Sequence, residues 1–260
     1  MAIETRHSLK VGNGKHTREI AVRKIDGGTP GLIWLGGYRS DMTGTKAQVI
    51  VDWSQKRGLS AVRFDYSGHG ESGGEFREGT VSRWLEEALA VFQEYTEGPQ
   101  ILVGSSLGAW IALRLAQELP KKGTSERLAG MLLIAPAPDF TSELMEPYFS
   151  GAQLKELESQ GYISETTEYS DEPNIITKNL IEDGRNNLVL NGIINTGCPV
   201  AILQGMRDPD VPYKHAMKLI DHLPSENVTM TLIKDGDHRL SRDQDLEIMK
   251  HILEQLLENR

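Results

Sequence analysis

The chain has 260 residues, 38% of them hydrophobic and 25% charged, which is enough for one large domain or two small ones with a buried core. A formal net charge of -9 argues against non-specific binding to nucleic acid or to anionic membranes. No apolar run is long enough to span a bilayer, and the opening MAIETRHSLK lacks the apolar core of a secretory signal. The single cysteine, Cys198, excludes an internal disulfide and fits a reducing compartment, so we expect a cytoplasmic protein.

Short apolar runs alternate with helix-like patterns along most of the chain. The predicted strands are residues 18–25, 31–35, 60–65, 100–103, 128–135, 199–204 and 228–234. The predicted helices are residues 45–56, 80–95, 106–119, 213–222 and 242–258. This alternation is typical of the α/β class, with a mostly parallel central sheet and helices on both faces.

The alternation breaks once, between residues 139 and 196. Eleven acidic and three basic residues give this segment a net charge of -8, nearly the whole charge of the protein. Residues 152–159 form a short helix pattern, and the segment opens with the apolar residues Phe140, Leu144, Met145, Tyr148 and Phe149. We predict a core of residues 1–138 and 197–260, with residues 139–196 as an acidic helical lid over the carboxyl ends of the strands. A solvated insertion with only a structural role is the alternative.

The stretch QILVGSSLGAWIALRLA, residues 100–116, contains two adjacent serines. Only Ser106 has glycine both two positions before and two positions after it, which is the pattern G-x-S-x-G. A predicted strand enters this pattern and a predicted helix leaves it, so Ser106 is expected at a sharp strand-to-helix turn that exposes a nucleophile. The helix start would place its positive end and the N–H of Leu107 beneath a developing oxyanion. Without that setting, a tight turn needing small residues explains the pattern equally well.

A serine hydroxyl needs a base and an orienting acid, which in this architecture follow the serine in the order acid, then histidine. His238 alone follows the last predicted strand, in the polar loop KDGDHRLS. Asp208 and Asp210 both lie in GMRDPDVP, after the strand at 199–204; position favours Asp208, and Asp139 is a third candidate. The remaining histidines are assigned to the N-terminal region, an earlier loop or helices: His7, His16, His69, His215, His222 and His251.

A second oxyanion donor is expected from the loop LGGYRSDMTGTKA, which follows the strand at 31–35. Its consecutive glycines let the backbone approach a substrate, so the N–H of Tyr38 or of Gly37 can turn inward. An ordinary strand-to-helix turn is the competing interpretation.

Residues 68–73, GHGESG, match the dinucleotide pattern G-x-G-x-x-G after a predicted strand. A dinucleotide site needs a helix that opens at the third glycine and an acid about 20 residues further on, at a strand end. Here the loop continues, and the region about 20 residues on is the middle of a predicted helix. We therefore predict no cofactor, and the absence of H-E-x-x-H, paired cysteines or an EF-hand loop predicts no metal.

The segments GGY, FDYSGHGESGG, GSSLG, GMRDPDVP and GDH, in this order and spacing, resemble the serine-dependent α/β-hydrolase superfamily. The longer segments GYRSDMTGTKA, RFDYSGHGESGG and GPQILVGSSLGAW are most similar to the mitochondrial acyl-protein (palmitoyl) thioesterases that also hydrolyse acyl glucuronides. The resemblance implies Ser106 as nucleophile, Asp208 as acid and His238 as base, with the N–H groups of Tyr38 and Leu107 as oxyanion hole. It also implies hydrolysis of a small-molecule ester or an acyl thioester, an S-acylated protein included.

The acidic lid is the part of the sequence that matches that subfamily least well, and because no mitochondrial targeting pattern is recognised we expect a cytoplasmic, bacterial-type relative. The lid's charge disfavours strongly anionic substrates such as acyl glucuronides, unless Lys155, Lys178 or Arg185 faces inward, and its apolar start favours an acyl chain. Two other functions use the same fold. One is a ligand-binding or signalling protein without turnover, and the other is a cofactor-free perhydrolase or haloperoxidase with the same triad.

Overall fold

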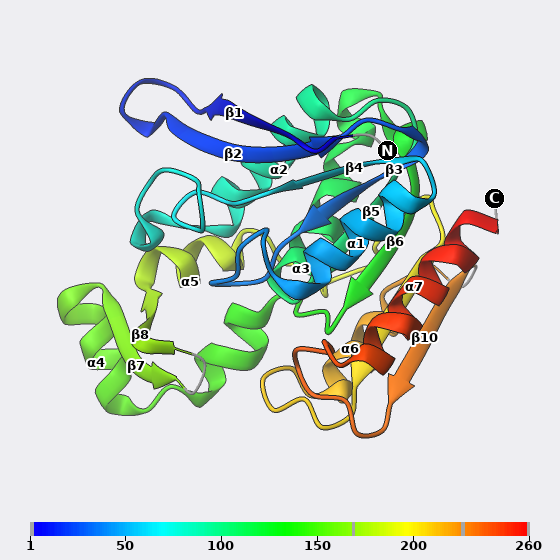
Figure 1. Ribbon diagram of the computed structural model, residues 1–260. Coiled ribbons are helices and arrows are strands. Elements are labelled where there is room, and N and C mark those ends of the chain that lie inside the picture. Colours follow the sequence, from blue (N-terminus) through cyan, green and yellow to red (C-terminus); the bar gives the residue numbers. More distant parts are fainter. Residues whose placement is uncertain (1–2, 168–169, 225–226, 259–260) are drawn as a thin grey trace.

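The computed structural model describes residues 3–167, 170–224 and 227–258. One eight-stranded sheet runs through it in the order β1-β2-β4-β3-β5-β6-β9-β10 (Figure 1). Its strands are β1 (Thr5–Val11), β2 (Arg18–Ile25), β3 (Gly28–Leu35), β4 (Leu59–Phe64), β5 (Gln100–Ser105), β6 (Leu128–Ile134), β9 (Val200–Gly205) and β10 (Val228–Ile233). Every pair from β4 to β10 is parallel, whereas β2 pairs antiparallel with both β1 and β4. The predicted mostly parallel sheet is confirmed.

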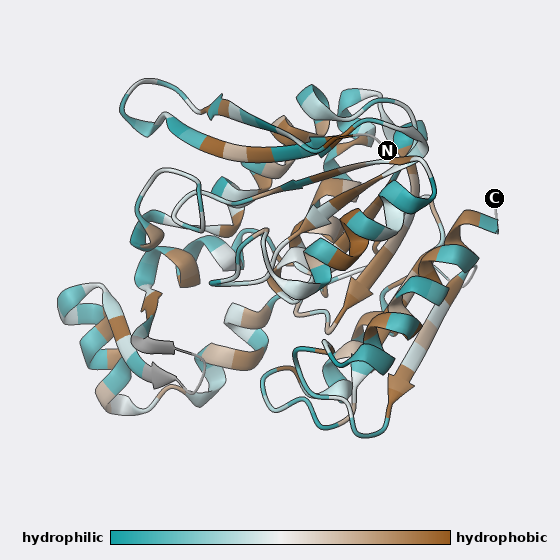
Figure 2. Cartoon of the chain, viewed as in Figure 1, coloured by the Kyte–Doolittle hydropathy of each residue, from teal (hydrophilic) through white to brown (hydrophobic). Residues whose placement is uncertain are grey.

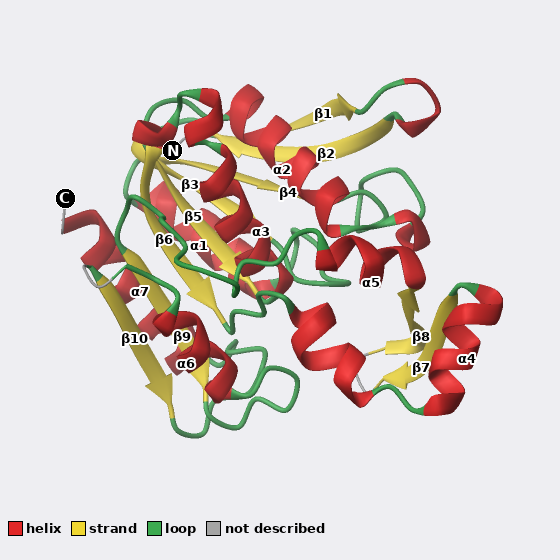
Figure 3. Cartoon of the chain, turned by 180° about the vertical axis from the view of Figure 1, so that it is seen from behind, coloured by secondary structure: helices red, strands yellow, loops and turns green. Residues whose placement is uncertain are grey.

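Helices cover both faces of this sheet. The helices are α1 (Thr45–Lys56) and α7 (Asp243–Glu258) on one face, and α2 (Val81–Tyr95), α3 (Leu107–Glu118) and α6 (Tyr213–Asp221) on the other (Figures 1 and 3). Each face has its own apolar core, and the core beneath α2, α3 and α6 contains the fully buried Trp84 of α2 and Trp110 of α3. Figure 2 shows apolar residues concentrated in the central strands. The apolar runs predicted as strands are therefore hydrophobic because both of their faces are covered.

The core elements follow the sequence prediction, with one addition. Strand β1 was not predicted, and five of its seven residues are exposed. An edge strand with so little buried surface has no apolar alternation to detect.

The segment predicted as the lid, residues 139–196, lies between β6 and β9 and contains helices, together with a β-hairpin that was not predicted. Its elements are the short turns η5 (Thr141–Met145) and η6 (Glu146–Tyr148), α4 (Gly151–Gln160), the strands β7 (Tyr162–Thr167) and β8 (Ser170–Thr177), and α5 (Lys178–Arg185). The predicted helix at 152–159 is present as α4, but β7 and β8 form an antiparallel hairpin. Among the side chains that the structure describes in the hairpin, the buried apolar ones are Ile163 and the opposite Ile176, so its strands carry a weak sequence signal.

Two of the three basic residues of the lid pair with acidic residues of the lid. Arg185 pairs with Glu146 at 2.5 Å, and Lys178 lies 3.9 Å from Glu182 on the same helix. Lid carboxylates therefore partly neutralise these two cations, and the preference against strongly anionic substrates stays a prediction.

Candidate active site

Ser106 lies in the turn between β5 and α3, as its flanking pattern predicts. Its backbone has φ 55° and ψ -116°, a conformation that costs a non-glycine residue free energy and is found where the fold forces it. The two flanking glycines explain how the turn closes. A Cβ on Gly104 would lie 2.5 Å from the carbonyl oxygen of Gly108, and one on Gly108 would lie 2.0 Å from that of Leu35. Only glycine fits at either position, while Ser105 is buried within the turn.

His238 and Asp208 are hydrogen bonded to each other. The Nδ1 atom of His238, in the loop after β10, lies 2.8 Å from Oδ2 of Asp208, in the loop after β9. The Asp208 side chain is fully buried, and its Oδ1 accepts the N–H groups of Asp210 and Val211 at 2.9 and 2.8 Å. A buried carboxylate held in this way orients the imidazole and favours the tautomer with its proton on Nδ1. Nε2 is then left as the basic nitrogen.

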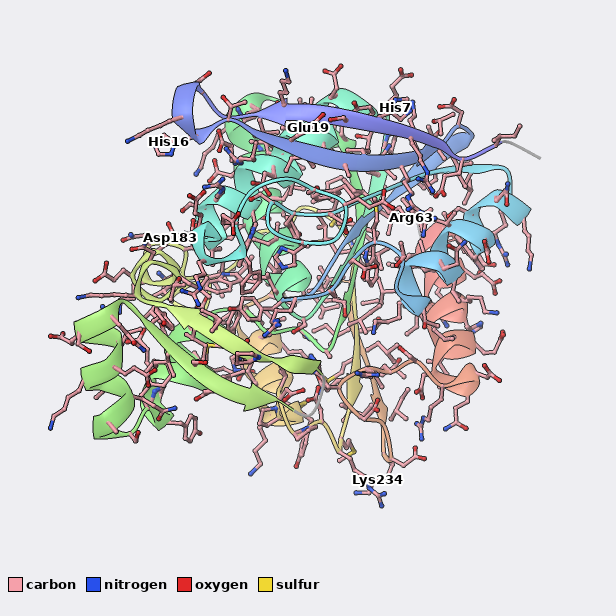
Figure 4. The ribbon with its side chains drawn as sticks, turned by 60° about the vertical axis from the view of Figure 1, so that its left-hand side comes forward. His7, His16, Glu19, Arg63, Asp183 and Lys234 are labelled. Carbon is pink, nitrogen blue, oxygen red and sulfur yellow. The ribbon has the colours of Figure 1, made fainter. Side chains whose placement is uncertain are left out.

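Three loops bring these residues to one edge of the sheet. Ser106, Asp208 and His238 follow the carboxyl ends of β5, β9 and β10, which belong to one parallel set. Carboxyl ends of parallel strands share an edge, which is where open α/β sheets bind ligands. Figure 4 shows His7 and His16 beside the β1–β2 hairpin, on the opposite side of the molecule from Lys234, which directly follows β10.

The two competing acids lie in different surroundings. Both oxygens of the buried Asp139 accept the N–H of Val189, and one also accepts that of Leu190. This carboxylate therefore fixes the segment in which the chain returns from the lid to the core. Asp210 is exposed, but it places a carboxylate atom within 4.8 Å of Asp208 and His238. Such a trio can ligate a cation, yet both Asp208 oxygens already accept hydrogen bonds within the protein.

Two helix histidines contact carbonyl groups away from Asp208. His215 is buried with Nε2 2.8 Å from the carbonyl oxygen of Pro138, and burial lowers its pKa. His222 has Nδ1 2.9 Å from the carbonyl oxygen of Gly192. Both bonds tie α6 to neighbouring loops.

The loop at residues 36–44, which is predicted to carry an oxyanion donor and is called the oxyanion loop, packs against the serine turn. A Cβ on Gly37 would lie 3.5 Å from Cβ of Ser106, so the loop backbone is next to the hydroxyl-bearing carbon. Within the described residues, neither the N–H of Tyr38 nor that of Leu107 donates to another protein atom. Their role as oxyanion donors stays a prediction.

His69 supports this loop, a role that the sequence did not reveal. Its Nε2 lies 3.1 Å from the backbone N of Arg39, and its Nδ1 lies 3.1 Å from the carbonyl oxygen of Ser67. Burial lowers the pKa of His69 to about 4, so the ring is neutral, donates from Nδ1 and accepts at Nε2. His69 thus links the loop at residues 68–73 to the oxyanion loop. No helix begins at the third glycine of the dinucleotide-like pattern, because α2 begins only at Val81. Both partners of the His69 ring are backbone atoms. Because any residue type supplies such atoms, the sequence gives no indication of these two bonds.

A cavity of 460 Å³ opens between the oxyanion loop, the loop carrying His69 and strand β8. Phe76 and Ile175 supply apolar surface to it, and Arg39 and Arg77 supply charge. Ser106 is not one of its lining residues, whereas Arg39, Ser40 and Asp41 of the oxyanion loop are.

Residues 27–249 match the Alpha/beta hydrolase family, and the chain belongs to this family. A putative hydrolase from Agrobacterium vitis S4 is 55% identical, with a TM-score of 0.95 over 98% of this chain and 99% of that one. Alpha/beta hydrolase domain-containing protein 10 from mouse is 32% identical, with a TM-score of 0.87 over 98% and 99% of the two chains. The mitochondrial palmitoyl-protein thioesterase ABHD10 of Homo sapiens is 32% identical over 99% of this chain and 82% of that protein. The fold and the family resemblance predicted from the motifs are confirmed.

Proposed function

We propose that this hydrolase cleaves carboxylic esters or acyl thioesters through an acyl-enzyme on Ser106, with His238 as base and Asp208 as acid. One observation carries the proposal. The 2.8 Å hydrogen bond between the His238 ring and the buried Asp208 carboxylate lies at the sheet edge that also presents Ser106. The names of the 32–33% identical relatives, palmitoyl-protein thioesterases, add support for an acyl substrate.

In the acylation step, Nε2 of His238 takes the proton of the Ser106 hydroxyl while the serine oxygen attacks the substrate carbonyl carbon. Asp208 keeps its charge and stabilises the imidazolium that forms. The tetrahedral oxyanion is held by the N–H groups of Tyr38 and Leu107, and removing one such donor typically costs roughly 100- to 1,000-fold in rate. The imidazolium then protonates the departing alcohol or thiol as the bond to it breaks.

In the deacylation step, water replaces the departed alcohol or thiol. His238 accepts a proton from the water as its oxygen attacks the acyl-enzyme, and the same two N–H groups hold the second oxyanion. Collapse of this intermediate returns the proton to Ser106 and releases the carboxylic acid. No metal or cofactor takes part in the proposed sequence.

The lid supplies the basis for substrate choice. We assign residues 139–196 to this role because they leave the core after β6 and return before β9, beside the proposed site. The apolar residues at the start of the lid differ in exposure: Phe140 is buried against the core, whereas Tyr148 is 78% exposed. With two lid cations paired to lid acids, we favour neutral esters and S-acyl groups, S-acylated proteins included.

The described chain has no helix with the length and apolar character needed to cross a bilayer. The name of the ABHD10 relatives places those proteins in mitochondria. For this chain we keep a cytoplasmic location as the proposal, because its single thiol, Cys198, fits a reducing compartment. Fractionation of the source cells tests it.

The test of function is a panel of acyl esters and acyl thioesters of increasing chain length, assayed with wild type and with Ser106→Ala. We expect turnover by wild type and a loss of about 10⁶-fold in kcat for the variant. A folded wild type that hydrolyses none of the panel supports the ligand-binding alternative. Peracid formation that outruns hydrolysis in the presence of hydrogen peroxide supports the perhydrolase alternative.

A further inference from the structure

The side chains of the oxyanion loop contact the lid. The hydroxyl of Tyr38 donates to the carbonyl oxygen of Ile175 at 2.7 Å, and Nη1 of Arg39 donates to that of Pro173 at 2.5 Å. Both carbonyl groups belong to β8, and strand carbonyls two residues apart point to the same edge. Two consecutive residues of the oxyanion loop therefore hold one edge of the lid hairpin.

The ring of Tyr38 is fixed by neighbours from three other segments. Its centroid lies 5.1 Å from that of Phe76, 6.0 Å from that of Trp84 in α2 and 6.0 Å from that of Phe140 at the start of the lid. Phe140 also packs edge-on against Trp110 of α3, the helix that follows the serine. With the ring packed in this way, the position of the hydroxyl and the position of the backbone N–H are set together.

We propose that Tyr38 is a positioning residue that couples the lid to the oxyanion hole: its hydroxyl holds β8, and β8 in turn fixes the loop whose N–H receives the oxyanion. The inference rests on the proposed function for its catalytic consequence. It makes the lid part of the apparatus that stabilises the transition state, in addition to covering the acyl group. A substrate too short to reach the lid should then still depend on the contact between Tyr38 and β8.

The experiment compares Tyr38→Phe with wild type on a two-carbon ester and a long-chain ester. The variant keeps the ring and the N–H and loses only the hydroxyl, whose net value corresponds to about a 3- to 10-fold effect. We expect kcat to fall by that factor for both esters, with the KM of the two-carbon ester unchanged. Tyr95→Phe is the matched control, because Tyr95 also donates to a carbonyl, that of Ser8, far from the site. It should leave kcat unchanged.

Other outcomes overturn the proposal. An unchanged kcat for the two-carbon ester, with only the long-chain KM raised, would make the lid a cover alone. A lowered melting temperature with unchanged kinetics would make the hydroxyl merely structural. An equal loss of kcat in Tyr95→Phe would make the effect unspecific.

A second readout needs no turnover. Hydrogen exchange, followed by mass spectrometry, should become faster in Tyr38→Phe for peptides covering residues 36–44 and residues 173–177 together. Faster exchange in the lid peptide alone, or in neither, contradicts the coupling. If wild type hydrolyses neither the esters nor the thioesters of the panel, the proposed function fails, and this exchange measurement still decides whether Tyr38 links the two segments.

Discussion

The core and the lid hold their charged side chains in different ways. In the core, the side chains of Arg18 and Glu87 are 3% and 0% exposed and meet at 2.6 Å, whereas in the lid those of Arg185 and Glu146 are 56% and 24% exposed. The apolar clusters also differ in size. Among the described residues, the cluster between α4, the hairpin and α5 has four buried members, whereas each of the two clusters of the core has many more. The residues proposed to react all belong to the core, whose strands are covered on both faces. This division predicts that changes in the core alter chemistry and stability strongly, and that changes on the lid surface alter them little.

The largest effect is expected from the proposed base. His238→Ala should lower kcat by about 10⁴- to 10⁶-fold, because it removes the imidazole proposed to take the proton of Ser106. Steady-state kinetics on the best ester of the panel measure the loss. His215→Ala is the comparison: a similar loss in that variant, still folded by circular dichroism, would show that the wrong histidine had been chosen.

Two neighbouring acids offer a sharper test within one loop. Asp208→Asn should lower kcat by roughly 10⁴-fold, because an amide in this place favours the wrong tautomer of the imidazole. Asp210→Asn, at an exposed position, should keep kcat within a few-fold of wild type. Parallel kinetics of the two variants measure the difference, and a reversed order would move the acid to Asp210.

Stability should depend strongly on the buried ion pair of the core. Arg18→Met removes the 2.6 Å ion pair of the buried Glu87 carboxylate and leaves it only the longer, 3.8 Å contact with Arg83, and burial already raises the pKa of Glu87. Losing one partner of such a pair costs about 3–5 kcal/mol of unfolding free energy. Urea unfolding at neutral pH measures it. A cost below 1 kcal/mol would mean that the pair contributes no more than a surface contact.

The neutral His69 predicts a dependence of stability on pH. Its pKa is lowered from 6.5 to about 4 in the folded protein, so between these values only the unfolded chain takes up the proton. The free energy of unfolding should therefore decrease by about 3 kcal/mol as the pH falls from 6.5 to 4, and this contribution is constant below pH 4. In His69→Gln that part of the decline should disappear, while His7→Gln, at an exposed position, should keep it. Equal pH slopes for all three proteins would contradict the assignment.

The smallest effect is expected on the lid surface. Arg185→Met removes the ion pair with Glu146, which solvent screens, so the unfolding free energy should change by less than about 1 kcal/mol. Urea unfolding beside Arg18→Met gives the direct comparison between the two regions. Equal costs would remove the distinction between core and lid.

The same division explains what could be predicted from the sequence. The turn at Ser106 was predictable because its strand, its glycines and its helix are neighbours in the chain, and His238 because it follows the last apolar strand. The hairpin of the lid was not, because its polar strands bury mainly Ile163 and Ile176. The contact from Tyr38 to Ile175 joins residues 137 positions apart, and one of its partners is a backbone carbonyl. Local patterns carry no information on such contacts.

The most direct measurement of the central claim is labelling with a fluorophosphonate probe, which reacts with serines activated by a base. Wild type should become labelled on the peptide that contains Ser106, as identified by mass spectrometry. Ser106→Ala should remain unlabelled, and His238→Ala should label far more slowly than wild type. A folded wild type that stays unlabelled, or a label carried equally by Ser106→Ala, would contradict the assignment of Ser106 as the nucleophile.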